Sequence, residues 1–422
     1  MVYGPLVAAL GHSRSAEFAR TGHSRWRASG GKSFVHFAAY HAAHRALERR
    51  LRRRGATMRL RAISVLMLAA AIMWAAPLLG LAAAGHPFLS YLGFAPRTQF
   101  VPHPSFEWGV FVTLSLPIAG ALALYWVAIA NARRRAAAPP QGRFPWWGWL
   151  GLGLIGASWF FAWHDGSVPP EWRRHVFTPL WLGYILVMNG LAFRHTGWAP
   201  LTHRTGWFLA LFPVSGGFWW LFEHLNQFVS TWYYSGIEAS GDGDYFIQTT
   251  LPFSTVIPAV ASTWVWLRHF PRLHTMRLPA IGGHGALAWF ALSGGLLALV
   301  CIGIWPDTLF PVLWLAPLLI LCALQQLLLG ETLFTSLQHG DWRPLLQPAL
   351  AALICGLLWE LWNFGSLAKW HYSIPYVQRY YLFEMPLLGY AGYLPFGIAC
   401  ALAMDLVARS IERRAVWPLD PQ

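Results

Sequence analysis

The stretch LLQPALAALICGLLWELWNFGSLAKWHY, Leu345–Tyr372, decides the fold class of this chain. Its first part, residues 345–366, is apolar for long enough to cross the roughly 30 Å of bilayer hydrocarbon as a helix, and only Glu360 carries a charge within it. Similar apolar runs lie at about 62–84, 107–131, 146–164, 176–193, 206–229, 246–267, 286–304, 309–330 and 386–408. The sequence therefore predicts an all-α, polytopic integral membrane protein with about ten transmembrane helices.

The composition agrees with a membrane protein. Hydrophobic residues make up 56% of the chain and charged residues 11%, whereas soluble domains carry about 25% charge. The net charge of +14 does not indicate nucleic-acid binding, because residues 1–61 hold 13 Lys and Arg against two acids. A basic segment ahead of the first span is typical of a cytoplasmic flank that meets anionic lipids. We therefore expect membrane lipids, and no nucleic acid, as partners.

The charges of the loops predict the orientation. With ten spans and a cytoplasmic N-terminus, 13 of the basic residues after the N-terminal segment fall on the cytoplasmic side. The opposite side carries five, which are Arg97, Arg173, Arg174, Lys369 and Arg379. Positive charge is retained on the cytoplasmic side of membranes. We therefore expect both termini in the cytoplasm and a location in a bacterial inner (cytoplasmic) membrane.

A short motif occurs twice and indicates an internal repeat. Glu223-x-x-Asn226 is followed by Trp232-x-Tyr234, and Glu360-x-x-Asn363 is followed by Trp370-x-Tyr372. Asn189 and Gln326 each precede the glutamate of their copy by 34 residues. These copies predict two parallel four-helix repeats, a known membrane architecture, after two N-terminal helices. The predicted parts are a basic, mostly disordered segment (1–57, with a helix through Phe34–Arg54), a two-helix unit (58–140), the repeats (141–275 and 276–410) and a cytoplasmic tail (411–422).

Glu223 and Glu360 are the first candidates for chemistry, since a charged group within hydrocarbon is costly and needs a reason. The amide three residues on, Asn226 or Asn363, shares a helix face with the carboxyl and is expected to hydrogen-bond it. An apolar, aromatic environment is expected to raise the pKa of a carboxyl, which favours a general acid. The alternative is a hydrogen-bonded pair that ties helices together.

Further candidates surround the second copy of the motif. Glu384 is expected at the outer start of the last span, facing the same cavity as Glu360, or else serving as an acid at a helix N-terminus. The candidate substrate-binding residues are Trp232, Tyr234, Trp359, Trp370, His371, Tyr372 and Arg379. Those of the outer loop suit an anionic headgroup or a diphosphate, or an interfacial aromatic belt. Asp242-Gly243-Asp244 hints at a cation, but no metal-binding, nucleotide-binding or hydrolase motif is present, so we expect no metal and no cofactor.

The duplicated motif and the segment Phe383–Gly392 together resemble the lycopene-cyclase-like membrane proteins of carotenoid and terpenoid pathways. The resemblance covers about residues 146–408 and implies that intramembrane carboxylates protonate an isoprenoid lipid to start cyclisation or isomerisation, without a cofactor. Residue by residue, it implicates Glu223, Glu360 and Glu384. The Pro-x-Glu-Glu signature of those proteins is absent, since this chain reads Glu384-Met385-Pro386.

Two other functions compete with an enzyme acting on a lipidic small molecule. One is a transporter or channel that uses the paired glutamates as a relay, and the other is a non-catalytic membrane scaffold. The arrangement of the glutamates discriminates between them. A shared aromatic cavity favours the enzyme, a continuous polar lumen favours transport, and glutamates on separate faces favour the scaffold.

Overall fold

The computed structural model of the chain describes residues 32–132, 142–164, 166, 168–282 and 284–417, with backbone alone for 32–54 and 284. It divides into two compact units, Met1–Thr57 and Met58–Gln422, and the description below concerns the second. The helix expected through Phe34–Arg54 is confirmed as part of α2 (Lys32–Ala83). The disorder expected for the rest of the N-terminal segment falls mainly on residues 1–31, which lie outside the described residues.

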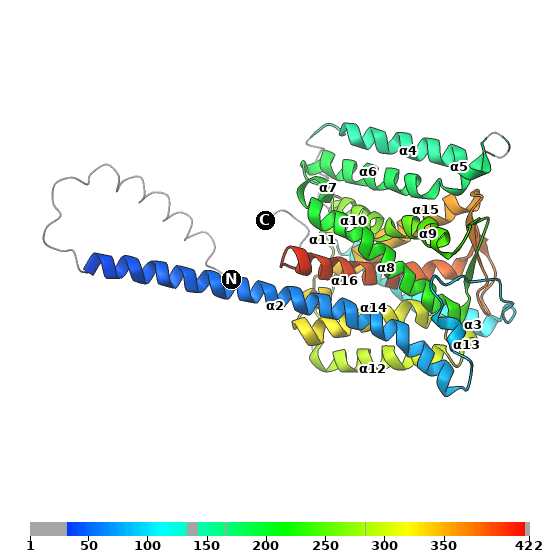
Figure 1. Cartoon of the computed structure of the whole chain (residues 1–422), viewed down its shortest axis with the longest axis horizontal. Coiled ribbons are helices and arrows are strands. Elements are labelled where there is room, and N and C mark those ends of the chain that lie inside the picture. The colour runs from blue at the N-terminus through cyan, green and yellow to red at the C-terminus, as the bar shows by residue number, and fades with distance from the viewer. Residues whose placement is uncertain (1–31, 133–141, 165, 167, 283, 418–422) are drawn as a thin grey trace. The chain divides into compact units, whose positions relative to one another are not determined.

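The predicted all-α polytopic fold is confirmed (Figure 1). The long helices that follow α2 are α3 (Trp108–Ala130), α4 (Trp146–Trp163), α6 (Phe177–Thr196), α8 (Thr205–Val229), α9 (Asp242–Ser254), α10 (Val256–Leu267), α12 (His284–Ile302), α14 (Val312–Leu329), α15 (Arg343–Phe364) and α16 (Tyr393–Ile411). Short helices are α5 (Pro170–Arg174), α7 (Pro200–His203), α11 (Pro271–Thr275), α13 (Pro306–Leu309), η1 (Leu89–Leu92), η2 (Leu333–His339) and η3 (Leu387–Gly392).

Eight helical segments of the described chain are long and apolar enough to cross a membrane. The two further predicted spans form the helices α4 and α6, of 18 and 20 residues, which are not among the eight. Tryptophan and glycine reduce the hydropathy of α4, and Asn189 and Arg194 reduce that of α6. The two helices pack against each other closely, because a Cβ on Gly151 would lie 2.7 Å from the carbonyl oxygen of Gly183. Small residues at such crossings let membrane helices approach.

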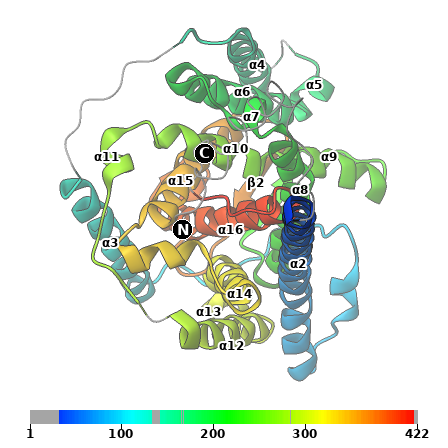
Figure 2. The same cartoon turned by 90° about the vertical axis from the view of Figure 1, so that its left-hand side faces the viewer.

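Helix α16 occupies the centre of this unit (Figure 2). It packs against α15, α14, α8 and α10, and its residues from Phe396 to Arg409 are almost all buried. The contact with α15 is close, since a Cβ on Gly397 would meet the carbonyl oxygen of Pro348 at 2.3 Å. Glycine thus lets the central helix touch the backbone of its neighbour.

Four short strands join the helices at one end of the bundle, and the sequence did not predict them (Figure 1). Strand β1 (Trp232–Ser235) pairs antiparallel with β2 (Lys369–Tyr372), and β3 (Tyr381–Leu382) pairs with β4 (Met385–Pro386). We call the end that carries β1 and β2 the strand end. Since β1 follows α8 and β2 follows α15, the two copies of the motif lie side by side there.

Candidate functional site

The carboxyl of Glu223 lies inside a cage of three donors. It sits in the last turns of α8, and its Oε1 accepts hydrogen bonds from Trp219 Nε1 (2.9 Å), Trp232 Nε1 (3.0 Å) and Tyr234 OH (2.5 Å). Its other oxygen, Oε2, is buried and has no hydrogen-bond partner among the described residues. The whole residue is 1% exposed. One oxygen therefore receives every donor, and the second remains unused.

Glu360 on α15 has a matching cage. Its Oε1 accepts from Tyr372 OH (2.7 Å), Tyr393 OH (2.9 Å) and Trp370 Nε1 (3.3 Å). Its Oε2 is again buried without a partner in the described part of the chain, and the residue is 0% exposed. In each cage, therefore, a tryptophan and a tyrosine two residues apart on one strand face the same carboxyl, as the alternation of a strand requires.

The two cages are related by the β1–β2 pairing. Tyr233 stands opposite His371, so that Trp232 faces Tyr372 and Tyr234 faces Trp370. An antiparallel pair centred in this way has local two-fold symmetry, which exchanges one Trp-x-Tyr with the other. The two copies of the Trp-x-Tyr motif are therefore related by symmetry at the site itself.

The two asparagines do not bind the carboxyls, and the expectation that they would is wrong. Asn226 Nδ2 donates to Trp232 O (2.8 Å), and its Oδ1 accepts from Thr231 N (2.9 Å). Asn363 makes the same exchange with the backbone of Trp370, at 2.8 and 2.9 Å. Each amide thus satisfies the main chain where the strand begins. The asparagine positions the strand, and the strand positions the donors to the glutamate.

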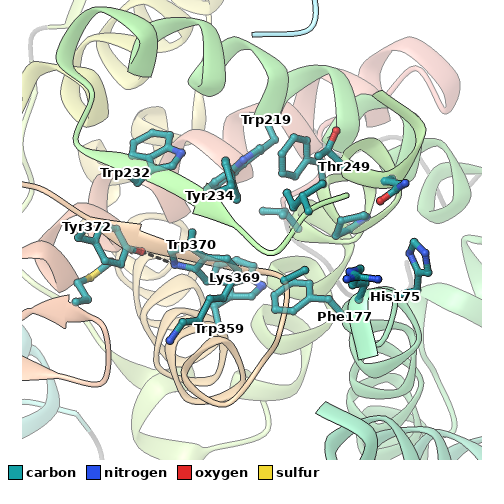
Figure 3. Close-up of a pocket in the computed structure, with 18 of the residues that line it drawn as sticks. His175, Phe177, Trp219, Trp232, Tyr234, Thr249, Trp359, Lys369, Trp370 and Tyr372 are labelled. Atoms are coloured by element: carbon teal, nitrogen blue, oxygen red, sulfur yellow. Dashed lines mark hydrogen bonds between the residues drawn. The ribbon is translucent and has the colours of Figure 1, made fainter. Parts of the chain in front are cut away.

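A cavity of about 130 Å³ lies between the cages. Figure 3 shows Trp219, Trp232 and Tyr234 on one side of it, opposite Trp359, Trp370 and Tyr372. Phe177, Phe253, Trp314, Met385 and Tyr393 complete most of its apolar wall. The polar side chains of Arg174, His175, Gln248, Thr249 and Lys369 also line it. Both glutamates lie behind this lining, with their tyrosine donors between them and the cavity.

The strand tyrosines keep their protons. Burial, together with the neighbouring Glu223, raises the pKa of Tyr234 well above its ordinary value. Burial and Glu360 do the same for the pKa of Tyr372. A phenol with a raised pKa is a hydrogen-bond donor at neutral pH. The hydroxyl groups therefore stand as proton-bearing contacts between each carboxyl and the cavity.

The remaining predicted site residues lie around the cavity rather than in it. Glu384 is in the turn between β3 and β4, three residues before the last candidate span (Leu387–Ile411), which begins with η3 and continues into α16. Its carboxyl pairs with Lys369 Nζ (2.5 Å) and lies 3.6 Å from His371 Nδ1. His371 Nε2 contacts Ser235 Oγ at 2.8 Å. Arg379 is exposed and lies over the rings of Phe106, Trp108 and Tyr380.

Two other carboxylate positions are structural. Asp405 is 1% exposed and accepts hydrogen bonds from Arg409 Nε (2.6 Å), the Gln325 amide and Val416 N. The Asp242-Gly243-Asp244 turn opens α9, with Asp242 paired to Arg97. Among the described residues, no group of three or more potential ligands could hold a metal ion there or elsewhere.

The structure also corrects the repeat in one detail. Asn189 Nδ2 on α6 donates to Ser262 Oγ on α10 at 2.8 Å. The matching link between α14 and α16 comes from Gln325, which is buried and donates to Asp405. Gln326, the predicted counterpart, donates to the backbone of Gly330 instead.

Sequence reasoning missed several residues of the site. Tyr393, Trp314, Phe177 and Phe253 line the cavity from α16, α14, α6 and α9, and nothing in their local sequence distinguishes them from other aromatic residues of the spans. Trp219 was not among the predicted site residues. Its position, four residues before Glu223, places it one turn away on the same helix face, which would have identified it as a donor.

The two glutamates lie on either side of a shared, largely aromatic cavity. Compared with protein-family models, curated proteins and solved structures, the chain matches none. The integral membrane character thus follows from the helices, and the chemistry has to be argued from the cavity.

Proposed function

We propose that this membrane protein is an enzyme that cyclises or isomerises an isoprenoid-type lipid by acid catalysis. The observation that carries the proposal is the cavity whose facing walls are each backed by a caged, buried glutamate. A volume of about 130 Å³ is close to that of a cavity known to bind benzene. One five- or six-carbon portion of a lipid therefore fits, while its remaining chain stays in the membrane.

The lining supports a reaction that passes through a carbocation. Five of the lining side chains are tryptophans, which are Trp219, Trp232, Trp314, Trp359 and Trp370. Indole faces attract a nearby cation more strongly than other aromatic rings do. Exclusion of water by such walls also protects the cation from capture.

The carboxyls supply the proton and recover it. Each carboxyl reaches the cavity through the tyrosine hydroxyls on its Oε1, and its neutral form can pass a proton along those contacts. Addition of that proton to a double bond forms a C–H bond and leaves a cation, which a second double bond of the lipid attacks to close a ring. Loss of a proton from the adjacent carbon restores a double bond and returns the proton to a carboxylate. The product is an isomer of the substrate, so no oxidant or other co-reactant is consumed.

The test is an isoprenoid extract from cells that express the chain, compared with Glu223→Gln and Glu360→Gln variants. Glutamine keeps the shape of the side chain and removes its acid. Loss of general acid catalysis is expected to reduce product formation about 10²–10⁴-fold. Glu107→Gln is the matched control, because Glu107 is exposed, caps α3 and lies outside the cavity lining.

A new cyclised or isomerised lipid in wild-type and Glu107→Gln extracts, absent from at least one of the two cavity variants at equal protein level, supports the proposal. An isoprenoid profile that is unchanged by any version of the properly inserted protein overturns it. Transport of a lipid or a proton, or a scaffold function, then becomes the better explanation of the paired carboxyls.

A further inference from the structure

The two cages differ in their third donor. Around Glu223 this donor is the indole of Trp219, from the same helix, at 2.9 Å. Around Glu360 it is the hydroxyl of Tyr393, from α16, also at 2.9 Å. The first two donors, a tryptophan and a tyrosine from a strand, are the same in both cages. The symmetry of the site therefore fails at one position.

The difference is built into the packing. The residue four positions before Glu360, where Trp219 stands relative to Glu223, is Gly356. A Cβ on Gly356 would lie 2.3 Å from the ring of Tyr393, so the tyrosine occupies the space beside this glycine. On the other side, the ring of Phe253, which has no hydroxyl, packs against Trp219 with centroids 5.9 Å apart. Each half thus fills the same place with a different kind of donor.

The replacement of an indole donor by a phenol donor changes how the cage can transfer a proton. An indole N–H only donates, whereas a phenol hydroxyl donates and accepts and can rotate to reverse its hydrogen bond. Glu360 contacts two hydroxyls that both line the cavity, Tyr372 and Tyr393, whereas Glu223 contacts one, Tyr234. A carboxyl between two hydroxyls has separate routes by which a proton leaves and returns.

We propose that Glu360 is the acid of this site and that Tyr393 is a catalytic residue that passes its proton to the substrate. The inference rests on the proposed function and assigns roles within it. In the step, the phenol proton of Tyr393 moves to a substrate carbon while the Glu360 proton moves to the phenol oxygen. Glu360 becomes a carboxylate, and the proton lost later from the neighbouring carbon restores it through Tyr372. Glu223, held by two indoles, positions its own wall of the cavity.

The test compares Tyr393→Phe with Trp219→Phe, which each remove the third donor from one cage. Product formation is expected to fall about 10²–10⁴-fold in Tyr393→Phe. A smaller fall, of about tenfold, is expected in Trp219→Phe, which removes one hydrogen bond and replaces an indole face of the cavity by a phenyl face. The ratio of the rates of product formation in H₂O and D₂O is expected to differ from wild type only in Tyr393→Phe. A variant that merely lost structure would keep the wild-type ratio.

A second measurement needs no substrate. The infrared carbonyl band of protonated Glu360, identified by its loss in Glu360→Gln, is followed after transfer of membranes containing the full chain into D₂O. Its exchange is expected to slow in Tyr393→Phe and to match wild type in Trp219→Phe.

Equal exchange in all three proteins, or no band that Glu360→Gln removes, overturns the inference. Loss of product in Glu223→Gln alone also overturns it while leaving the proposed function intact. Slowed exchange in a protein that forms no product supports the relay and contradicts only the proposed reaction.

Discussion

Some buried polar side chains of this site hydrogen-bond the backbone of the strands instead of another side chain. Asn226 and Asn363 are both 0% exposed, and both exchange two hydrogen bonds with the first residues of a strand. The i, i+3 spacing that makes Asn363 a neighbour of Glu360 also brings it to the helix end, where the chain turns back. The sequence predicted a hydrogen bond between the glutamate and the asparagine of each motif. Asn363 instead bonds the backbone of Trp370, seven residues later, which helical spacing alone does not reveal.

Asn363→Ala is expected to destabilise the protein because the N–H and C=O of the half-buried Trp370 lose their partner. An unpaired buried group costs about 1–3 kcal/mol, so the free energy of unfolding should fall by at least that much. Thermal denaturation in detergent measures the change. Asn131→Ala is the control, since Asn131 is an exposed residue that follows α3. Equal stability of the two variants would contradict the role given to Asn363.

At the scale of the element, the site depends on two strands that the sequence analysis did not predict. Four-residue strands are too short to show an alternating hydrophobic pattern among membrane helices. The signal was nevertheless present, because Trp-x-Tyr spacing places both side chains on one face of a strand. The long apolar runs form helices, and eight helical segments of the described chain are long and apolar enough to cross a membrane, because length and hydropathy decide membrane helices. The donors from other helices, such as Tyr393, depend on packing that a local pattern does not encode.

Gly236 follows β1 in a conformation that a side chain would disturb. Its φ is +73°, and a Cβ there would lie 2.1 Å from the carbonyl oxygen of Leu367, just ahead of β2. Gly236→Ala therefore adds a clash to the roughly 1–2 kcal/mol that a left-handed residue costs. Gly330→Ala is the matched control, with φ +79° and nothing within 4 Å of the added carbon.

We expect a larger loss of unfolding free energy in Gly236→Ala than in Gly330→Ala, measured by thermal denaturation. Product formation should also fall only in Gly236→Ala, since the β1–β2 pairing carries the donors of both cages. If the two alanine variants have the same stability and form the same amount of product, the contact with Leu367 does not constrain the paired strands β1 and β2.

For the whole molecule, the consequence of the duplicated motif is that both glutamates lie at one end of the bundle. Helices α8 and α15 both lead into the paired strands, while α16 ends at the opposite end (Figure 1). The distribution of loop charge predicts that the strand end faces away from the cytoplasm. In that orientation, the proposed lipid substrate would enter the cavity from the outer side of the membrane.

Two glycine positions test this orientation directly. Gly243 at the start of α9 lies at the strand end, and Gly282 precedes α12 at the other; both are exposed, with nothing within 4 Å of an added Cβ. In intact cells, a membrane-impermeant thiol reagent is expected to label Gly243→Cys, and to label Gly282→Cys only after the membrane is opened. The unmodified chain is the control, because its four cysteines lie within the helices of the bundle. The reverse pattern would put the strand end in the cytoplasm, and the cavity would then draw its lipid from the inner leaflet. Labelling of both positions in intact cells would contradict a single orientation, and the orientation predicted from the basic residues of the loops would then be wrong.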